Sequence, residues 1–387
     1  MHSAPMATPN RAAVLADAQP AAQGTAELSS LDHYLRPMQW LLRDTQVTEI
    51  CINSPGSAWV ERYSGWKQEG LPFCTFDWCM ALANLVSNFT KQRVSATEPI
   101  LSATLPSGER VQFVLPPVVG DGCVSITIRK PSIMLWTLDQ LASTTPIESE
   151  LPDGQCATLT LDVFRDTALM PKQRDDADLL QADSSDGDRE LINLLLARDF
   201  MTFLRRAVQL RKNILLSGAT GSGKTTIAKA LILEVPSDDR IVTIEDVREL
   251  VLRNQPNSVP MLYSQGGQGQ AKVTGGDLLV SAKRMRPDRV FVSELRTGDE
   301  AYDYLVSINS GHPGSITSVH ADTAEGAFIA LAQIMKRSEA GKGMSTREGV
   351  ELAQLNVDVV VQCARIKQRR CVSEIWYDPS TKRRGLA

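Results

Sequence analysis

The sequence lacks several features that would assign the protein to a large class. No apolar run approaches the roughly 18 residues that cross a bilayer, so we predict no membrane helix. The seven cysteines form no C-x-x-C pair and are odd in number, which points to a reducing compartment and against a zinc site. With 41 Lys and Arg residues against 45 Asp and Glu, the formal net charge of -4 gives no electrostatic footprint for broad nucleic-acid binding.

Length and composition are those of a folded protein with more than one unit. The 387 residues exceed what one hydrophobic core usually organises, so we expect two folded units. Apolar residues make up 43% and charged residues 22%, the usage of soluble globular proteins rather than of disordered or fibrous chains. Residues 1–28 are rich in Ala and Pro and lack the apolar stretch of a secretory signal, so we expect a disordered tail.

Patterning predicts a mixed α+β unit over residues 29–140. Apolar residues recur at helical spacing after Ser29, and Ser29 with Asp32 is placed as a capping box that would start a helix. A second helix is predicted over residues 77–89. Alternation of apolar and polar residues predicts strands over 48–53, 58–63, 110–115 and 124–129.

Residues 141–190 are predicted to be a long, flexible, acidic linker, because the periodic spacing of apolar residues is lost there and Pro, Gly and Asp are frequent. Residues 191–387 then alternate strands with helices, which predicts an α/β unit with a mostly parallel sheet. The predicted helices begin near Thr225, Asp277 and Thr323. The predicted strands are 213–218, 240–246, 289–295, 314–320 and 358–364.

The stretch GATGSGKT after the first of these strands matches the phosphate-binding pattern G-x-x-x-x-G-K-[ST]. An apolar strand precedes it and a helix-forming run follows, so backbone N–H groups and a helix N-terminus can turn toward phosphates. Lys224 can reach the β- and γ-phosphates, and the Thr225 hydroxyl can bind Mg²⁺. The motif predicts nucleotide contacts from Gly218, Ala219, Thr220, Gly221, Ser222, Gly223, Lys224, Thr225 and Thr226.

Hydrolysis also needs carboxylates, and two predicted strand ends offer them. Glu245 and Asp246 end one strand, and Glu294 ends another with Arg296 just beyond. Ligands bind at the C-terminal strand ends of open α/β sheets, so we expect these groups to converge on the phosphate loop. A strand-end acid can also cap the turn that follows, and for one carboxylate alone both roles stay open.

Histidines and arginines add candidates that the residues alone do not assign. His312 and His320 flank one predicted strand, and a lone histidine is more often a turn or core residue than a phosphate sensor. Arg110 and Arg129 fall on the polar faces of their strands, where a solvated arginine is the default. The basic runs 365–370 and 381–387 are too short to identify a partner.

These motifs, in this order, resemble the hexameric traffic ATPases of type IV secretion and conjugation systems, within the secretion ATPase superfamily. The likeness covers most of residues 30–377. Beside the phosphate loop, its specific parts are an Asp box over 240–250, a Walker B segment over 284–296 and a His box over 310–322. One departure is Ser293, where the family usually has Gly before the Walker B glutamate.

The resemblance implies a RecA-like P-loop domain over 191–387, preceded by a smaller PAS-like N-terminal domain. It implies a six-membered ring in which ATP and Mg²⁺ bind between the two domains of each subunit and turnover moves the N-terminal domains. Glu245 would be the leading candidate for positioning the attacking water, and His320 would sense the γ-phosphate. Glu294 would serve Mg²⁺ together with Thr225, directly or through water. Arg110 and Arg129 would reach the phosphates when the domains close.

The same resemblance implies a motor that powers pilus assembly or the transfer of protein or DNA substrates. Its partners would be inner-membrane components of a type IV secretion system and the secreted substrate, at the cytoplasmic face of the inner membrane. No sequence-specific nucleic-acid binding is expected.

Three alternatives to this motor stay open. Type II secretion motors usually carry four zinc-binding cysteines late in the chain, where only Cys363 and Cys371 occur here, which disfavours that class and leaves pilus-retraction motors. A nucleotide-binding scaffold is disfavoured by the intact motifs. A nucleic-acid translocase is disfavoured by the acidic balance and by residues 100–118 and 125–132, which resemble the N-terminal domain of the secretion family.

Overall fold

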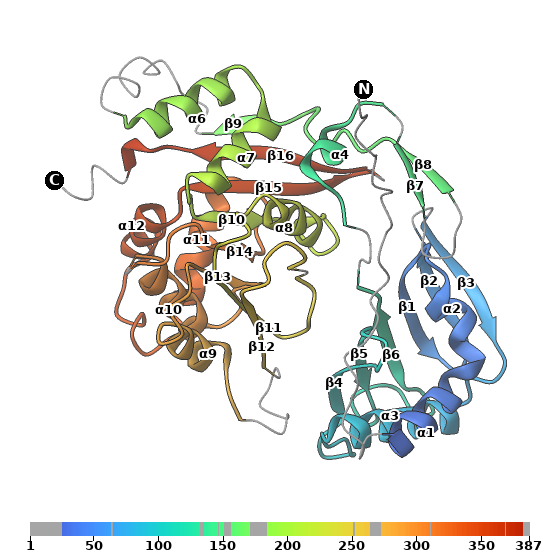
Figure 1. Ribbon diagram of the computed structural model, residues 1–387. Coiled ribbons are helices and arrows are strands. Elements are labelled where there is room, and N and C mark those ends of the chain that lie inside the picture. The colour runs from blue at the N-terminus through green and yellow to red at the C-terminus, as the bar shows by residue number, and fades with distance from the viewer. Residues whose placement is uncertain are drawn as a thin grey trace, which may run out of the picture.

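A computed structural model describes residues 25–62, 65–131, 135–145, 147–150, 156–170, 184–250, 252–263, 272–309, 311–367 and 369–381 (Figure 1). The residues of the predicted tail before Thr25 lie outside this part of the chain. In the described part, no helix is both long and apolar enough to span a bilayer.

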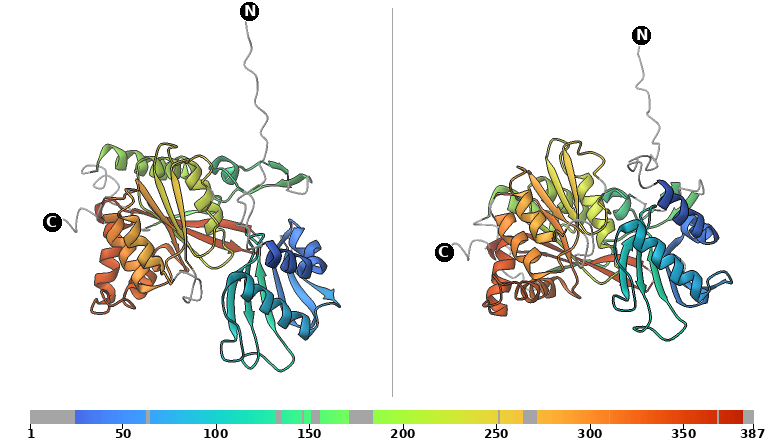
Figure 2. Two further views of the ribbon diagram at one scale, coloured as in Figure 1. Left: turned by 60° about the horizontal axis from the view of Figure 1, so that its bottom comes forward. Right: turned by 90° about the horizontal axis from the view of Figure 1, so that it is seen from below.

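The N-terminal unit is a six-stranded antiparallel sheet with helices on one face (Figures 1 and 2). Apolar residues alternate along its strands, so every second side chain packs under α1 and α3 and the intervening ones lie on the opposite face. The sheet order is β3-β2-β1-β6-β5-β4. The elements are α1 (Thr25–Leu35), η1 (Arg36–Met38), α2 (Gln39–Arg43), β1 (Val47–Ser54), β2 (Gly56–Arg62), β3 (Gly65–Leu71), α3 (Phe76–Thr90), β4 (Ile100–Thr104), β5 (Arg110–Val114) and β6 (Ser125–Arg129).

The predicted start of the first helix at Ser29 is wrong. α1 begins at Thr25, so Ser29 and Asp32 lie inside the helix rather than forming its cap. Leu31 and Leu35 are buried in the core of the N-terminal unit. Packing of an apolar face, more than local capping, therefore decides where this helix runs.

Several described residues of the predicted flexible, acidic linker over 141–190 lie in regular elements. α4 (Leu138–Ala142) ends inside it, β7 (Ile147–Glu150) pairs with β8 (Cys156–Leu159), and α6 (Asp186–Leu196) begins inside it. β9 (Ala168–Met170) pairs in parallel with the edge of the C-terminal sheet. Backbone hydrogen bonds to that edge order residues whose composition suggested flexibility.

The predicted α/β class with a mostly parallel sheet is confirmed for the C-terminal unit. Its strands form the orders β14-β10-β15-β16-β9 and β12-β11-β13, with parallel pairing except between β15 and β16. The elements after α6 are α7 (Phe200–Gln209), β10 (Ile214–Ser217), α8 (Lys224–Leu233), β11 (Ile241–Glu245), β12 (Ser258–Leu262), α9 (Gly275–Ala282), β13 (Arg289–Val292), α10 (Gly298–Asn309), β14 (Ile316–Val319), α11 (Ala324–Met335), α12 (Thr346–Asn356), β15 (Val359–Ile366) and β16 (Arg369–Tyr377).

Helices cover both faces of this sheet. Ile214 and Leu216 of β10 pack with α6, α7 and α8, whereas Leu215 packs with α9, α10 and α11. The two sets of strands meet where the Leu295 N–H, just after β13, donates to the carbonyl of Ser318 on β14 at 2.9 Å. This arrangement brings the C-terminal ends of β10, β11, β13 and β14 to one edge, where the motifs lie.

Candidate active site

The phosphate loop joins β10 to α8 and depends on glycine at two positions. Gly218 has φ +147°, and a Cβ there would overlap the carbonyl oxygen of Cys363 on β15. Gly223 has φ +103° and forms the N-cap of α8. A side chain is disfavoured at both positions. Because glycine has none, the loop can turn back over the strand and present its amides at the start of α8.

Lys224 is folded back onto this loop. Its Nζ donates to the carbonyl oxygens of Gly218 at 2.6 Å and Ala219 at 3.1 Å, and lies 3.3 Å from Nδ1 of His320. The residue is only 9% exposed. Burial lowers the pKa of Lys224, and the nearby carboxylate of Glu294 opposes that shift. The ammonium group is therefore held beside the loop by carbonyl groups.

Glu294 is the predicted carboxylate that faces the phosphate loop. Its Oε1 lies 2.8 Å from Nε2 of His320, and its Oε2 accepts from Nη2 of Arg296 at 2.9 Å. Burial alone would raise the pKa of Glu294, but the hydrogen bond and charge of Arg296, with the charges of His320 and Lys224, hold that pKa below its usual range. Glu294 is therefore held in its ionised form by the neighbouring cations.

His320 completes this cluster of side chains beside the phosphate loop. His320 directly follows β14, and its Nδ1 lies 3.1 Å from the carbonyl oxygen of Gly218. The parallel pairing of β14 with β10 sets Val319 opposite Ser217, which brings the residues after both strands together. His312, four residues before β14, contacts the carbonyl oxygen of Pro287 instead.

Arg110 brings the N-terminal unit to this site. Its Nη2 donates to Oδ1 of Asp246 at 2.7 Å and lies 3.4 Å from Oε1 of Glu249. Arg296 pairs with the other oxygen of Asp246 and also with Glu294. A continuous chain of ion pairs therefore connects β5 of the N-terminal sheet to Glu294, which contacts His320, and His320 in turn lies beside Lys224.

Arg129 lies beside Arg110 but is more exposed. The two arginines are direct cross-strand partners on β6 and β5. No acidic partner of Arg129 occurs in the part of the chain that the structure describes, yet its charge is close enough to contribute to the lowered pKa of Lys224. The structure thus brings both predicted arginines to the C-terminal site, and only Arg110 is ion-paired there.

Glu245 does not face the phosphate loop. It is fully buried, and its Oε2 accepts the backbone N–H groups of Glu249 at 2.7 Å and Leu250 at 2.8 Å. Its Oε1 accepts the Thr243 hydroxyl at 3.0 Å, and burial raises its pKa. These are the bonds of a residue that caps the turn after β11, so this geometry does not support the predicted water-positioning role.

Sequence reasoning missed Glu249, which contacts two predicted site residues. The Thr225 hydroxyl donates to Oε2 of Glu249 at 3.3 Å, and the other carboxyl oxygen of Glu249 faces Arg110. Glu249 lies four residues beyond its strand end, in a loop that the bonds to Glu245 fold back. Its only sequence signal was its position inside the Asp box.

Known proteins resemble this chain over most of its length. Residues 148–380 match the family described as Type II/IV secretion system protein. The type IV secretion system protein VirB11 of Bartonella henselae is 42% identical over 349 residues, which cover 90% of this chain and 93% of the relative. The chain belongs to the VirB11 family of type IV secretion ATPases. The prediction of a P-loop ATPase that belongs to a type IV secretion system is confirmed by this membership.

A second relative agrees with the VirB11 assignment, and a solved structure shares the fold. VirB11 of Brucella suis is 39% identical over 360 residues, which cover 92% of this chain and 92% of the relative. The crystal structure of the pilus retraction motor PilT with bound ADP has a TM-score of 0.53 at 17% identity and covers 91% of this chain and 86% of that one. The PilT match shows a shared fold, and the VirB11 identities distinguish the family.

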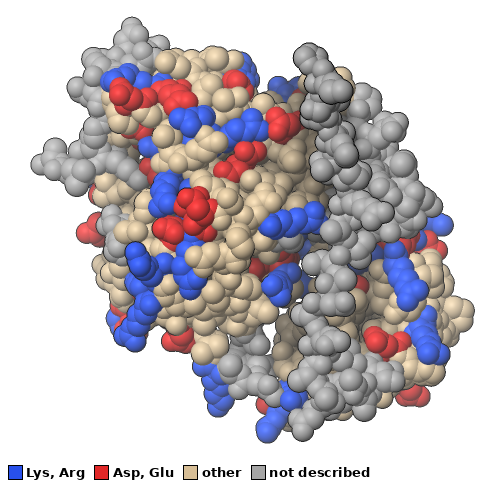
Figure 3. All heavy atoms as spheres, viewed as in Figure 1, with Lys and Arg blue, Asp and Glu red and all other residues tan. Residues whose placement is uncertain are grey.

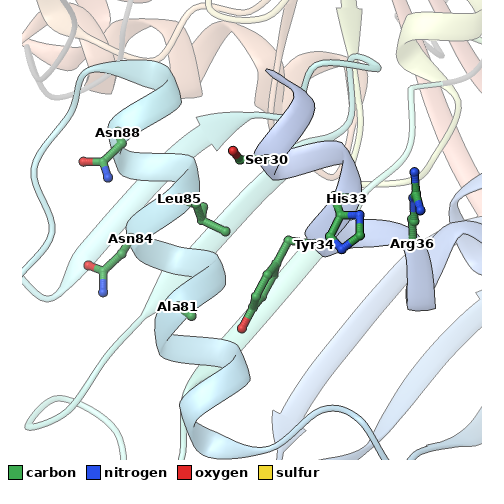
Figure 4. Close-up of a pocket in the computed structure, with 8 residues that line it drawn as sticks. All are labelled: Ser30, His33, Tyr34, Arg36, Ala81, Asn84, Leu85 and Asn88. Carbon is green, nitrogen blue, oxygen red and sulfur yellow. The ribbon is translucent and has the colours of Figure 1, made fainter. Parts of the chain in front are cut away.

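Within the ranges that the structure describes, no group of three or more His, Cys, Asp or Glu side chains is placed to hold a metal ion. A hollow of about 700 Å³ lies between α1 and α3, lined by residues that include Tyr34, Asn84 and Asn88. Tyr34 extends toward α3, whereas the two asparagines point away from α1 (Figure 4). On the face drawn in Figure 3, Lys and Arg side chains are interspersed with Asp and Glu rather than gathered in a field of one sign.

Proposed function

We propose that this VirB11-family chain binds ATP with Mg²⁺ at the phosphate loop and hydrolyses it as the N-terminal unit closes on the site. The observation that carries the proposal is the ion-pair chain from Arg110 through Asp246 and Arg296 to Glu294 and His320. It connects a cation of one unit to the P-loop of the other, so a change at the nucleotide site can move the N-terminal unit.

The residues at the loop fit a nucleoside triphosphate with its metal. Ser222 Oγ and Arg110 Nε are buried and lack a partner in the described part of the chain, so donors are available for phosphate oxygens. Backbone amides from Gly218 to Thr226 and the Lys224 ammonium would hold the phosphates. Thr225 and Glu294, directly or through water, would hold Mg²⁺. The bound metal would neutralise charge that develops on the phosphate oxygens.

Each carboxylate and histidine of the site would have a separate role in hydrolysis. Glu294 would orient the attacking water and accept its proton, because it is the predicted carboxylate that stays charged beside Lys224. His320 would report the γ-phosphate through its contact with Glu294. Glu249 would hold the Thr225 hydroxyl, and Glu245 would keep the loop that carries Glu249 folded.

Arg110 and Arg129 would act as closure sensors. The partners of Arg110 in this structure are carboxylates, which phosphate oxygens can replace because both are anionic acceptors. Exchange of Asp246 for phosphate would draw β5 and β6 toward the loop, and product release would reverse it. ATP binding and release would in this way become movement of the N-terminal unit.

We expect Arg110→Gln to lower kcat/KM for ATP. A hydrogen bond to a charged group contributes about 1.5–3 kcal/mol, which corresponds to roughly 10- to 100-fold. Steady-state kinetics on the purified variant provide the measurement. The matched control is Arg93→Gln, which removes an exposed arginine of the same unit and should stay within twofold of wild type. Equal kinetics for the two variants would remove Arg110 from the site.

We propose two units, an N-terminal one from α1 to β6 and a C-terminal one from α6 onward, with the residues between them partly attached to the C-terminal unit. The family further supports a homohexamer that works at the cytoplasmic face of the inner membrane. Its partners would be the inner-membrane components of a type IV secretion system and the secreted substrate. Such a ring would power pilus assembly or substrate transfer.

The first test is ATP turnover by the full chain with and without Mg²⁺, on samples sized by light scattering. We expect phosphate release that depends on Mg²⁺ from a species near six times the 42.4 kDa chain. Addition of EDTA should abolish turnover and leave the protein folded by circular dichroism. An assembled hexamer that releases no phosphate with Mg²⁺ would favour the nucleotide-binding scaffold instead.

A further inference from the structure

A long hairpin extends beyond the end of the C-terminal sheet toward the N-terminal unit. β10 pairs with β15 only over Val359 to Gln362, so the rest of β15 and the start of β16 project past the end of β10. Because β10 and β15 run parallel, this projection lies on the side where the phosphate loop begins. Figures 1 and 2 both show the β15–β16 ribbon reaching toward the N-terminal unit.

Two arginines face each other across this projection. Arg365 of β15 and Arg370 of β16 are direct cross-strand partners. Like charges in such a pair destabilise a hairpin unless each finds a partner elsewhere. Nη1 of Arg365 lies 3.0 Å from Oε1 of Glu61 on β2, and Nε of Arg370 donates to the Gly221 carbonyl oxygen at 3.0 Å. One arginine therefore contacts the N-terminal unit and the other contacts the phosphate loop.

The Arg370 contact fixes a peptide plane inside the phosphate loop. In a trans peptide the carbonyl of Gly221 and the N–H of Ser222 point in opposite directions. A carbonyl held by Arg370 therefore turns the Ser222 N–H away from the hairpin. The Arg370 side chain also covers Gly223, where a Cβ would lie 3.5 Å from its Cδ. Arg370 thus restrains the part of the loop whose amides would meet a phosphate.

The Arg365 contact holds the same sheet face that carries the two closure arginines. Cross-strand pairing places Glu61 opposite Glu49, Glu49 opposite Arg129, and Arg129 opposite Arg110. These four residues form one row across the face that turns away from α1 and α3. Arg365 holds the acidic end of the row, and the arginine end reaches the nucleotide site. Any movement of this face must therefore either carry the hairpin with it or break the Arg365–Glu61 pair.

We infer that Arg370 is a positioning residue for the phosphate loop and that Arg365 couples it to the N-terminal unit through Glu61. The inference rests on the proposed nucleotide site and adds a second connection to it, independent of Arg110. Closure of the N-terminal unit would move the hairpin through Arg365 and so change the Gly221 peptide. The hairpin would tune nucleotide affinity without touching the reacting atoms.

The test is a charge exchange in the full-length protein, with a fluorescent ADP derivative as the probe. Glu61→Arg and Arg365→Glu should each weaken its binding about three- to tenfold, and the double variant should return to within twofold of wild type. Arg370→Ala should weaken binding about tenfold because a hydrogen bond from a charged group is lost. It should raise KM for ATP more than it lowers kcat, since positioning affects ground state and transition state alike.

A second exchange serves as the matched control. Arg347→Glu with Glu351→Arg swaps an exposed i,i+4 ion pair on α12 and should leave ADP affinity unchanged in single and double variants. Thermal unfolding of every variant separates misfolding from altered affinity, and Arg365→Gln replaces Arg365→Glu if the reversal prevents folding. Unchanged affinity in the Glu61 and Arg365 variants, or no recovery in the double variant, would overturn the coupling. Failure of wild type to bind the probe would instead overturn the proposed function.

Discussion

Glu294→Gln is expected to lower ATP turnover by about 10²–10⁴-fold, the usual contribution of a positioned general base. The change removes the negative charge on which Arg296 and His320 converge, and it leaves Lys224 beside a neutral amide. The folded structure should survive, because glutamine has the same length and can still accept a hydrogen bond from Arg296. Turnover should therefore fall much further than stability.

The matched variant is Glu245→Gln, which makes the same chemical change at the end of the neighbouring strand. A glutamine oxygen can accept the two backbone N–H groups that Glu245 now accepts, and its amide can donate to the hydroxyl of Thr243. We expect turnover within about fivefold of wild type, because glutamine can still cap the turn after β11.

Single-turnover phosphate release at saturating ATP distinguishes the two carboxylates. A large loss in Glu245→Gln with near-normal turnover in Glu294→Gln would exchange their roles and restore the prediction made from the sequence. Comparable losses in both variants would indicate that the carboxylates act as one unit. Circular dichroism and light scattering on each sample ensure that folded, assembled protein is compared.

The sequence could predict the phosphate loop and the strand-end groups because their chemistry is local. Gly218, Gly223 and Lys224 stand at fixed spacing between an apolar strand and a helix, so their placement follows from the strand and helix alone. Glu294 and His320 meet because parallel strands end at one edge. Only the order of strands in the sheet was needed to bring them together.

The remaining site residues depend on tertiary contacts that spacing does not encode. Glu245 is the last residue of β11, whereas Glu294 lies two residues beyond β13, and the backbone N–H groups of the loop after β11 bind the Glu245 carboxylate. Arg110 lies 136 residues from Asp246 in the chain, so their ion pair depends on how the two units pack. Arg370 belongs to a basic run whose charge alone identified no partner.

Lys224→Ala is expected to abolish detectable ATP turnover, a loss of about 10²–10³-fold or more by comparison with removal of one electrostatic donor. Nζ of Lys224 now donates to two carbonyl groups of the loop, which phosphate oxygens would outcompete as charged acceptors. Alanine leaves no cation within the loop itself. The charge balance with Glu294 and His320 would also be lost, so binding and chemistry should both weaken.

A control for the loss of any buried lysine is Lys229→Met, on the same helix. Lys229 is 3% exposed, and burial lowers its pKa as it does for Lys224. Methionine keeps the apolar stem, so this variant should fold and retain most of its turnover, because Lys229 lies one and a half turns beyond the loop. If Lys229→Met is as inactive as Lys224→Ala, the defect comes from helix packing rather than from phosphate binding. If Lys224→Ala still hydrolyses ATP at the wild-type rate, the reacting phosphates lie elsewhere, and the roles proposed for Glu294 and Arg110 fail with it.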